Sequence, residues 1–275
     1  MANRHFSEPI TRIISDIAEL GKYLWQKGWA ERNAGNISVN INEYVPDEMK
    51  AELSEQQEAC LELDTSYPGI AGYYFLVTGT GKRMRDLAVD PEHNALMIRV
   101  NDKGTGYYIL SLSGIDTNIH PTSELFAHLA IHQQLVANGA CERAVVHTHP
   151  NELISITQIR DFCNERALNR LLWGMHPETM VIVPDGAGYL PYMLPGSREI
   201  ADATLEKFQN HKVVIWEKHG CFAIGRDVFE AFDLIDTLAK SAQIYFQCRA
   251  AGHEPEGLTD ERIAELKELS KKFLT

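Results

Sequence analysis

Hydrophobic side chains recur at helical spacing in several stretches of the chain. Between residues 10 and 27, isoleucines, leucines and a tryptophan repeat every three or four positions, which predicts an amphipathic helix. Pro121, Thr122 and Ser123 mark the start of another helix, since proline and hydroxyl residues favour the first turn. Further helices are predicted over residues 151–172, 198–208 and 227–250, and a last one is capped by Thr259.

Other stretches show the alternation or the short apolar runs of β-strands. Residues 37–41 alternate, and residues 43–70 are polar and acidic, which indicates an irregular or short-helix excursion. Strands are also predicted at 73–82, which breaks into a Gly-x-Gly turn, at 95–112 as a hairpin, and at 144–146. Residues 180–186 are predicted to form a strand and a turn, and residues 213–225 a pair of strands turning at His219 and Gly220. Because strands and helices mix without strict alternation, we expect residues 1–275 to form a single α/β domain with a largely antiparallel or mixed sheet between helices.

The composition is that of an ordinary globular protein, and its charge narrows the range of partners. Of 275 residues, 44% are hydrophobic and 23% are charged, and the net charge is −12 without any block of lysine and arginine, so nucleic acid is not an expected partner. No apolar run approaches the roughly 20 residues of a membrane span, and the first residues lack the apolar core of a secretory signal. Five scattered cysteines without C-x-x-C spacing indicate reduced thiols in a cytoplasmic protein.

The sequence A-V-V-H-T-H-P-N at residues 144–151 carries two histidines at the end of an apolar run. Alternate residues of a strand face the same side, so His147 and His149 should point the same way. Two such imidazoles supply half of a zinc-type site, although a pair of hydrogen-bonded core histidines would give the same pattern. His219, at a sharp turn before Gly220, is the best candidate for a third ligand, and three histidines leave a coordination position open for a substrate.

Two further histidines share a helix face with an acidic residue. Glu124, His128 and His132 are spaced at i, i+4 and i+8. We interpret the histidines as packing groups or as groups behind the site, with metal ligation as the less favoured alternative. Two interpretations account for an acidic residue at position 124. The helix dipole favours acids in a first turn, or Glu124 is a general base near a metal.

Two glycine turns are candidates for binding an anion. R-N-A-G-N at 32–36 and T-G-T-G-K at 78–82 can expose backbone amides, and Ser123 at a helix start could add a third donor. An acidic protein can bind a phosphorylated substrate only through such local donors. Each turn alone is a weak signal, because glycine turns often have no other role.

Taken in order, R-N-A-G-N-I-S, T-G-T-G-K, P-T-S-E-L-x-x-H, H-T-H and W-E-K-H-G resemble the motifs of the class II (zinc) aldolase/adducin family of sugar-phosphate enzymes. They extend from about residue 12 to about residue 250. Three features favour the branch of the rhamnulose-1-phosphate aldolases: the extra length in 43–70 and 86–115, the segments 184–196 and 235–243, and Glu124 where the epimerases of the family carry Asp.

The resemblance implies a fold and a set of site residues. The fold would be a three-layer αβα sandwich with a central, mainly antiparallel sheet, assembled as a homotetramer with active sites at subunit interfaces. By this resemblance one Zn²⁺ per subunit would be held by the three histidines, Glu124 would be the catalytic carboxylate, and Glu178 would be a second acid that reaches into a neighbouring subunit's site. The positions that match phosphate-binding residues are Asn33, Gly35, Asn36, Thr80, Gly81 and Ser123. Thr80 stands where the family has Ser, and Ala34 replaces a glycine of the first turn.

The resemblance also implies a reaction. L-Rhamnulose 1-phosphate would be cleaved to dihydroxyacetone phosphate and L-lactaldehyde through a zinc-stabilised enediolate. The alternatives within the family are an L-fuculose-1-phosphate aldolase, a ribulose-5-phosphate 4-epimerase and a sugar-phosphate dehydratase. A non-catalytic module like the adducin heads would not need three histidines and an acid, and a metal-storage protein would have no use for the glycine turns.

Overall fold

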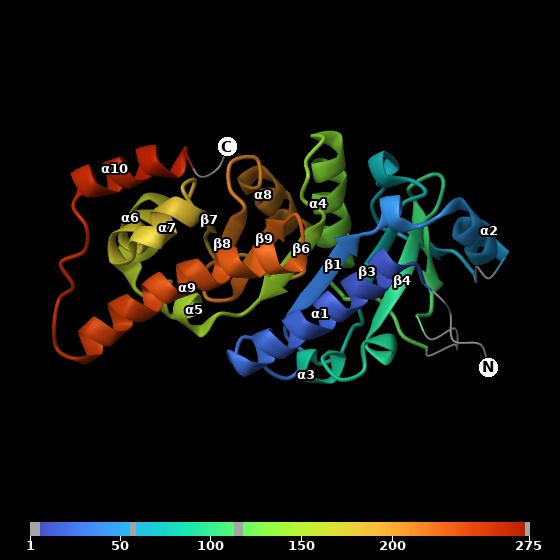
Figure 1. Cartoon of the computed structure of the whole chain (residues 1–275), viewed down its shortest axis with the longest axis horizontal. Helices are drawn as coiled ribbons and strands as arrows, with labels where there is room; N and C mark the ends of the chain where they lie inside the picture. The colour runs from blue at the N-terminus through green and yellow to red at the C-terminus, as the bar shows by residue number, and fades with distance from the viewer. Residues whose placement is uncertain (1–5, 56–58, 113–117, 273–275) are drawn as a thin grey trace. The chain divides into compact units, whose positions relative to one another are not determined.

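The chain, seen as a computed structural model in Figure 1, is described here for residues 6–55, 59–112 and 118–272. Residues 56–58 and 113–115 of the two expected excursions therefore lie outside the described residues. The chain divides into two compact units: the first comprises residues up to 146 together with 224–229, and the second comprises 147–223 and the residues from 230 onward. The expectation of a single domain stays a prediction.

The first unit is built on an antiparallel sheet. Its strands lie in the order β2-β5-β4-β3-β1-β6, and each of the pairs β2–β5, β5–β4, β4–β3 and β3–β1 is antiparallel. The elements are α1 (Glu8–Gln26), β1 (Asn36–Asn40), α2 (Asp47–Glu55), β2 (Leu61–Glu62), β3 (Tyr74–Thr78), α3 (Met84–Leu87), β4 (Ala95–Val100), β5 (Gly106–Leu110), α4 (Leu125–Ala137) and β6 (Ala144–Thr148), with short 3₁₀ turns at Asn42–Tyr44, Pro68–Ile70 and Pro91–His93. The predicted helix at 10–27, the strand at 37–41 and the hairpin at 95–112 are confirmed.

Alternation along the strands gives this sheet a face for the core. Phe75 and Val77 of β3 lie with Leu125 and Leu129 of α4 in one buried cluster, which also includes β4 side chains. Complete burial of such side chains contributes about 1.5–3 kcal/mol each. α1 lies across β1 and β3 (Figure 1), and it packs closely on α3 at Gly21. The face of β1 that points toward α4 is unusual, because it carries the buried polar side chains of Asn36 and Ser38 instead of apolar ones.

The second unit has a smaller sheet in the order β9-β8-β7. β8 pairs antiparallel with β9 and parallel with β7, and every residue of these three strands is buried. Its elements are α5 (Asn151–Ile156), a 3₁₀ turn at Arg160–Phe162, α6 (Glu165–Met175), α7 (Pro177–Ile182), β7 (Ala187–Leu190), α8 (Arg198–Lys207), β8 (Val213–Trp216), β9 (Gly220–Gly225), α9 (Val228–Ala250) and α10 (Asp260–Ser270). The strand pair turning at His219, the helices at 198–208 and 227–250, and the Thr259 cap, which accepts from the amide of Arg262, agree with the sequence.

Two sequence predictions in this unit are wrong. The strand expected to begin at 180 is instead the end of the helix α7; the expected turn follows at 184–185, and the strand comes after it at Ala187. The β-branched run favours a strand, but Pro177 at the first helical position and burial of Thr179 against Ser241 of α9 (Oγ–Oγ 2.7 Å) override that preference. The expected helix at 151–172 is broken into α5, a 3₁₀ turn and α6, because the Asn164 side chain caps a new helix.

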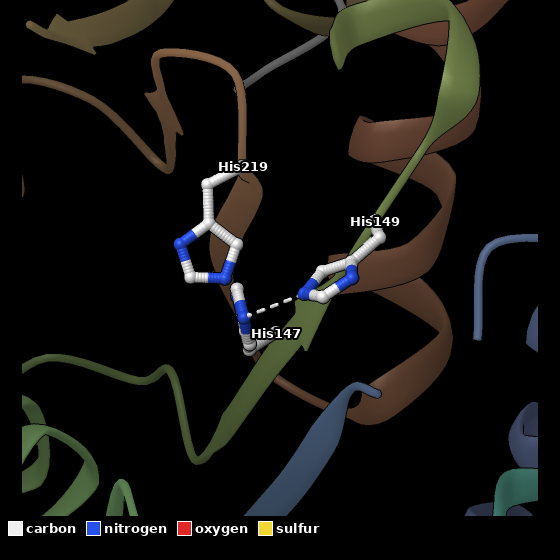
Figure 2. Close-up of side chains that lie close together, drawn as sticks. All are labelled: His147, His149 and His219. Carbon is white, nitrogen blue, oxygen red and sulfur yellow. Dashed lines mark hydrogen bonds between the residues drawn. The ribbon is translucent and has the colours of Figure 1, made fainter. Parts of the chain in front are cut away.

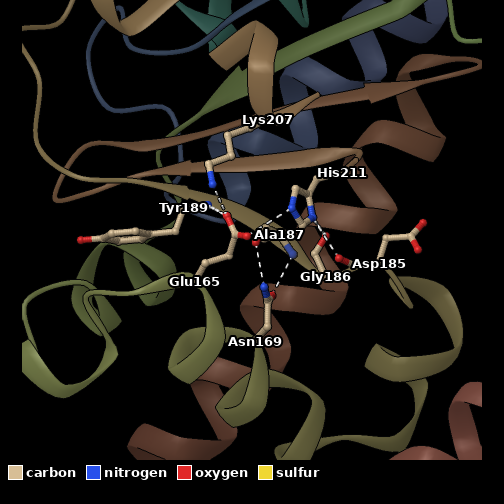
Figure 3. A network of polar contacts seen from close by, with 8 residues as sticks. All are labelled: Glu165, Asn169, Asp185, Gly186, Ala187, Tyr189, Lys207 and His211. Carbon is tan, nitrogen blue, oxygen red and sulfur yellow. Dashed lines mark hydrogen bonds and ion pairs between the residues drawn. The ribbon is translucent and has the colours of Figure 1, made fainter. Parts of the chain in front are cut away.

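A polar network fixes where β7 begins (Figure 3). Asn169 of α6 accepts from the backbone N–H of Ala187 and donates to its C=O, both at 2.8 Å. The carboxylate of Glu165 accepts from the amide of Tyr189 and from Lys207 Nζ at 2.6 Å. Burial opposes ionisation of Glu165, but these donors outweigh it and lower the pKa of the carboxyl group. The outer strand of this sheet is therefore anchored by side chains as well as by β8.

The predicted class, an α/β fold with a mainly antiparallel sheet flanked by helices, is confirmed. Of the strand pairs given above, that of β7 with β8 is parallel. Among the described residues, no helix has both the length and the apolar character that crossing a membrane requires.

Candidate functional site

Three histidines converge at one point of the second unit. His147 lies near the end of β6, His149 directly follows that strand, and His219 lies in the turn between β8 and β9 (Figure 2). One nitrogen from each ring lies within 4.8 Å of the others. The structure thus brings together the three side chains that the sequence suggested as metal ligands.

The spacing of the first two rings suits a shared ion. His147 Nε2 and His149 Nε2 are 3.3 Å apart. Two nitrogens bonded to one zinc at about 2.0–2.1 Å with a tetrahedral angle would be separated by about 3.3 Å. Their separation therefore needs no rearrangement for both nitrogens to reach the same metal.

The tautomer of His147 is set by the backbone of β9. Its Nδ1 lies 2.9 Å from the carbonyl oxygen of Cys221, so Nδ1 carries the proton and Nε2 keeps its lone pair. The ring is 2% exposed and stacks on Phe222 with centroids 4.3 Å apart. Burial, helped by the neighbouring imidazoles of His149 and His219, lowers the pKa of His147 well below its usual value. His147 is thus neutral and oriented, as a metal ligand must be.

The turn that carries His219 is tightly specified. Lys218 adopts a left-handed conformation (φ 61°), and its amide donates to Thr157 Oγ1 at 2.9 Å. At Gly220 a Cβ would come within 2.4 Å of the carbonyl oxygen of Thr148. Only glycine lets β9 start this close to the end of β6, which is how His219 reaches the two other histidines.

The donor set fits a divalent metal of the zinc type. Three imidazole nitrogens suit zinc and several neighbouring transition metals, and they leave room for at least one further ligand. A structural zinc site would be closed by a fourth protein ligand, and within the described residues the cluster that could hold a metal consists of these three histidines. A metal ion held by these three histidines would keep a coordination position open for a further ligand.

In the first unit, Glu124 is the end of a buried chain of hydrogen bonds. Asn36 Nδ2 donates to Glu124 Oε2 at 2.6 Å, and Asn36 Oδ1 is in contact with His128 Nε2. His128 Nδ1 lies 2.6 Å from Ser38 Oγ, which lies 2.8 Å from His132 Nε2. His128 and His132 are therefore buried, hydrogen-bonded side chains and not members of the histidine cluster. Whether they only pack or also support a site stays a prediction.

The three segments expected to bind phosphate meet beside Glu124. The amide of Ile37 donates to Thr78 Oγ1 at 3.0 Å, and the amide of Thr122 donates to the carbonyl of Thr78 at 2.9 Å. A bridge between Gly79 and Pro121 continues this contact. The turns at 32–36 and 78–82 and the start of α4 are thus held together at one end of β1 and β3.

Within these turns the individual positions differ in accessibility. The side chains of Asn33, Thr80 and Ser123 are exposed, whereas Asn36 is 7% exposed. Gly35 and Gly81 have φ values of 80° and 69°, the left-handed region in which consecutive amides can point to one side.

Glu178 belongs to the second unit and lies in the first turn of α7. Its carboxylate is exposed and pairs with His176 Nε2 at 3.0 Å. In this single chain Glu178 is not part of the histidine cluster, and its role stays a prediction.

Sequence reasoning missed Ser38 and the carbonyl of Cys221. The spacing of Glu124, His128 and His132 already indicated a shared helix face, and the alternation of β1 placed Ser38 on the same side as Asn36. That second signal could have found Ser38. A backbone carbonyl has no sequence signal.

Comparison with known proteins gives a consistent result. The family described as class II aldolase and adducin N-terminal domain matches residues 15–246. A rhamnulose-1-phosphate aldolase of Bacteroides thetaiotaomicron is 44% identical over 257 residues, covering 94% of this chain and 93% of the relative. One of Mannheimia succiniciproducens is 36% identical, covering 91% and 90%.

Comparison with solved structures also identifies aldolases as similar proteins. A sugar-phosphate aldolase from Thermotoga maritima superposes with a TM-score of 0.75 at 33% identity, covering 90% of this chain and 98% of the other. An L-fuculose 1-phosphate aldolase, at 18% identity and a TM-score of 0.63, covers 98% and 99% and shows the shared fold. The resemblance inferred from the ordered motifs is confirmed: this chain belongs to the class II aldolase and adducin family.

Proposed function

We propose that this chain is a class II aldehyde-lyase that cleaves L-rhamnulose 1-phosphate to dihydroxyacetone phosphate and L-lactaldehyde. The observation that carries the reaction class is the open cluster of His147, His149 and His219, with its neutral and oriented His147. The choice of substrate is supported by the rhamnulose-1-phosphate aldolases at 36–44% identity over nearly the whole chain. A catalytically inactive adducin-like role would leave the three histidines without a purpose.

The metal in this proposal is one Zn²⁺ per subunit, held by the three histidines. A bound divalent ion supplies Lewis acidity, which stabilises the negative charge that develops when the C3–C4 bond of the sugar breaks, a contribution of several kcal/mol. No lysine Schiff base is then required. The chain's part is to present three imidazole nitrogens within 4.8 Å of one another and to keep a position open.

The phosphate of the substrate would be bound by the turns of the first unit. Asn33, Gly35, Asn36, Thr80, Gly81 and Ser123 are the proposed contacts. Their segments are joined by the bonds of Thr78, and the exposed amides and hydroxyls can each donate to an anion. With a net charge of −12, the protein depends on such local donors rather than on its overall field.

Two carboxylates would move protons. As C3–C4 breaks, the hydroxyl at C4 must lose its proton to become the aldehyde, and C3 must gain one. Glu124 is proposed to deliver the proton to C3, and in the reverse direction to remove it. Glu178, which is exposed on α7, is proposed to serve the C4 oxygen of a neighbouring subunit.

The proposed assembly follows from the resemblance, and the proposed location follows from the cysteines. We propose a homotetramer with active sites at subunit interfaces, in the cytoplasm. The five cysteines without C-x-x-C spacing suit a reducing compartment, and all that the structure describes are free thiols.

The proposal is tested by turnover of L-rhamnulose 1-phosphate, measured through release of dihydroxyacetone phosphate. The protein is assayed as purified, after chelation, and after reloading with Zn²⁺, beside His149→Ala and a matched His253→Ala control. His253 is an exposed histidine that follows the end of α9. We expect His149→Ala to lose at least about 100-fold in activity, more than loss of a residue behind a metal ligand, together with its bound metal. The control should keep both.

Other substrates decide between family members. If the zinc-loaded protein does not cleave L-rhamnulose 1-phosphate but does cleave L-fuculose 1-phosphate, the substrate assignment changes to L-fuculose 1-phosphate. Epimerisation of ribulose 5-phosphate or dehydration of a sugar phosphate would replace the reaction as well. Activity that survives complete removal of bound metal would refute the role of the histidine cluster.

A further inference from the structure

Behind Glu124 lies a group of four buried polar side chains, of which Ser38, His128 and His132 have no role in the proposed metal and phosphate binding. His128 and His132 project from α4, and Asn36 and Ser38 project from β1 toward them. All four are at most 7% exposed, and His132 also packs on the ring of Phe75 with centroids 4.8 Å apart. Polar groups are costly in such a place unless they are hydrogen-bonded, so their arrangement requires a reason.

The protons of this chain can be assigned from its chemistry. A carboxylate can only accept, so Asn36 must turn its NH₂ toward Glu124 and its oxygen toward His128. That oxygen requires a proton on His128 Nε2, which in the neutral ring leaves Nδ1 bare. Ser38 then donates to Nδ1, and its oxygen accepts from Nε2–H of His132. Burial, helped by the nearby His128, lowers the pKa of His132 to about 3, which keeps that ring neutral.

Every hydrogen bond in the chain therefore has the same direction, from His132 through Ser38, His128 and Asn36 to the carboxylate. If donor and acceptor were exchanged in one of these hydrogen bonds, two donors or two acceptors would face each other in the next one. The carboxylate of Glu124 thus sets the flip of the Asn36 amide, and His128, Ser38 and His132 continue the chain in the one order of donors and acceptors that this flip allows.

We propose that Ser38, His128 and His132 are positioning residues, which fix the amide of Asn36 and through it the carboxylate of Glu124. This inference rests on the proposed function, in which Glu124 carries the proton to and from the substrate. With the amide flipped, the Asn36 oxygen would face the carboxylate and repel it. A proton-transfer group displaced by even about 1 Å can lose on the order of 100-fold in rate.

Ser38→Ala is the direct test, because the Ser38 hydroxyl is bonded to His128 and His132 and is separated from Glu124 by His128 and Asn36. It removes the proton donor to His128 and the acceptor for His132. We expect kcat to fall by about 10- to 100-fold, as for losses behind other catalytic groups, while KM and bound metal change far less. The matched control is Ser241→Ala, which removes another fully buried serine hydroxyl, bonded to Thr179 in the second unit. Equal kcat values for the two variants would overturn the proposal.

Two further variants distinguish a loss of positioning from a general loss of stability. Ser38→Thr keeps the hydroxyl and should recover most of the rate that Ser38→Ala loses. His132→Leu breaks the chain at its far end and should lower kcat in the same direction as Ser38→Ala. Melting curves of all variants are compared, and a loss of rate that follows the loss of melting temperature across the set, Ser241→Ala included, would refute a positioning role.

A spectroscopic measurement separates this inference from the proposed function. In protein labelled with ¹⁵N-histidine, both His128 and His132 should appear as neutral rings protonated at Nε2 at pH 7, and Ser38→Ala should shift both signals. An Nδ1-protonated or doubly protonated ring at either position would overturn the hydrogen-bond order, whatever the substrate. If the tautomers are as expected but no sugar phosphate is cleaved, the proposed function fails while the order of the chain stands.

Discussion

Burial of His132 makes the stability of this protein dependent on pH in a defined direction. The ring is 1% exposed, and its pKa is lowered from 6.5 to about 3 by burial and by His128. Between these values the unfolded chain binds a proton at this position and the folded chain does not. Stability therefore falls as the pH falls below about 6.5, with a limiting slope of about 1.4 kcal/mol per pH unit.

The size of the effect at a given pH follows from the two pKa values. At pH 7 the unfolded chain is only partly protonated at this position, and the cost is about 0.2 kcal/mol. At pH 5 the cost reaches about 2 kcal/mol. Acidification from pH 7 to pH 5 should thus remove nearly 2 kcal/mol (on the order of 10–30-fold in the folding equilibrium) through this residue.

The assay compares urea unfolding of the wild-type protein and His132→Gln at pH 7, 6 and 5. Glutamine keeps an N–H that can donate to Ser38 but does not titrate, so the variant retains the hydrogen bond and loses the pH dependence. Other groups, the metal-binding histidines included, change equally in both proteins, and their effects cancel in the difference. The variant should lose about 2 kcal/mol less than the wild type on going from pH 7 to pH 5. Parallel pH dependence of the two proteins would refute the assignment of a neutral, buried His132.

Three other substitutions test individual contacts within the second unit. Gly220→Ala would place a Cβ about 2.4 Å from the carbonyl oxygen of Thr148, so we expect lower stability and a reduced metal content by elemental analysis; a fully metallated variant would contradict this account of the turn. Asn169→Ala leaves the N–H and C=O of Ala187 without their partner, which should lower the free energy of unfolding by about 2–4 kcal/mol in denaturant titrations. Thr259→Ala removes the cap of α10 and should cost about 1 kcal/mol in the same measurement, with catalytic constants unchanged.

The sequence predicted the histidine cluster well because its logic is local. A strand sends alternate residues to one side, so H-x-H already fixes two imidazoles relative to each other. His219 was added because a histidine before a glycine lies at a sharp turn. Where that turn lies relative to β6 depends on the close approach of Gly220 to Thr148, which is a tertiary contact without a sequence pattern.

The fold was predictable where periodicity was strong and wrong where tertiary contacts overrode propensity. The amphipathic pattern of α1 and the hairpin of β4 and β5 are determined by local spacing and turn residues. The run at 180–183 is β-branched, yet it forms α7 because Pro177 starts a helix and Thr179 is buried against α9. No property of the run itself indicates that outcome.

The partners of Asn36 could not be predicted for a different reason. The sequence suggested that this residue binds phosphate, because it lies in a glycine turn. Its position at the first residue of β1 also directs its amide toward α4, where Glu124 and His128 are its neighbours. An amide has two ends, and one sequence motif cannot tell which neighbour each end will meet.

The histidine cluster also has a mechanical consequence. A bound metal would tie His147 and His149 to His219, and so would close a loop of about 70 residues that contains α5, α6, α7, α8, β7 and β8. Cross-linking a loop of that length reduces the entropy of the unfolded chain by an amount worth about 4 kcal/mol. Metal supply in the cell would then set the protein's resistance to proteolysis and its lifetime. A metal-starved cell would hold less of this protein, because the chain without metal would be degraded sooner.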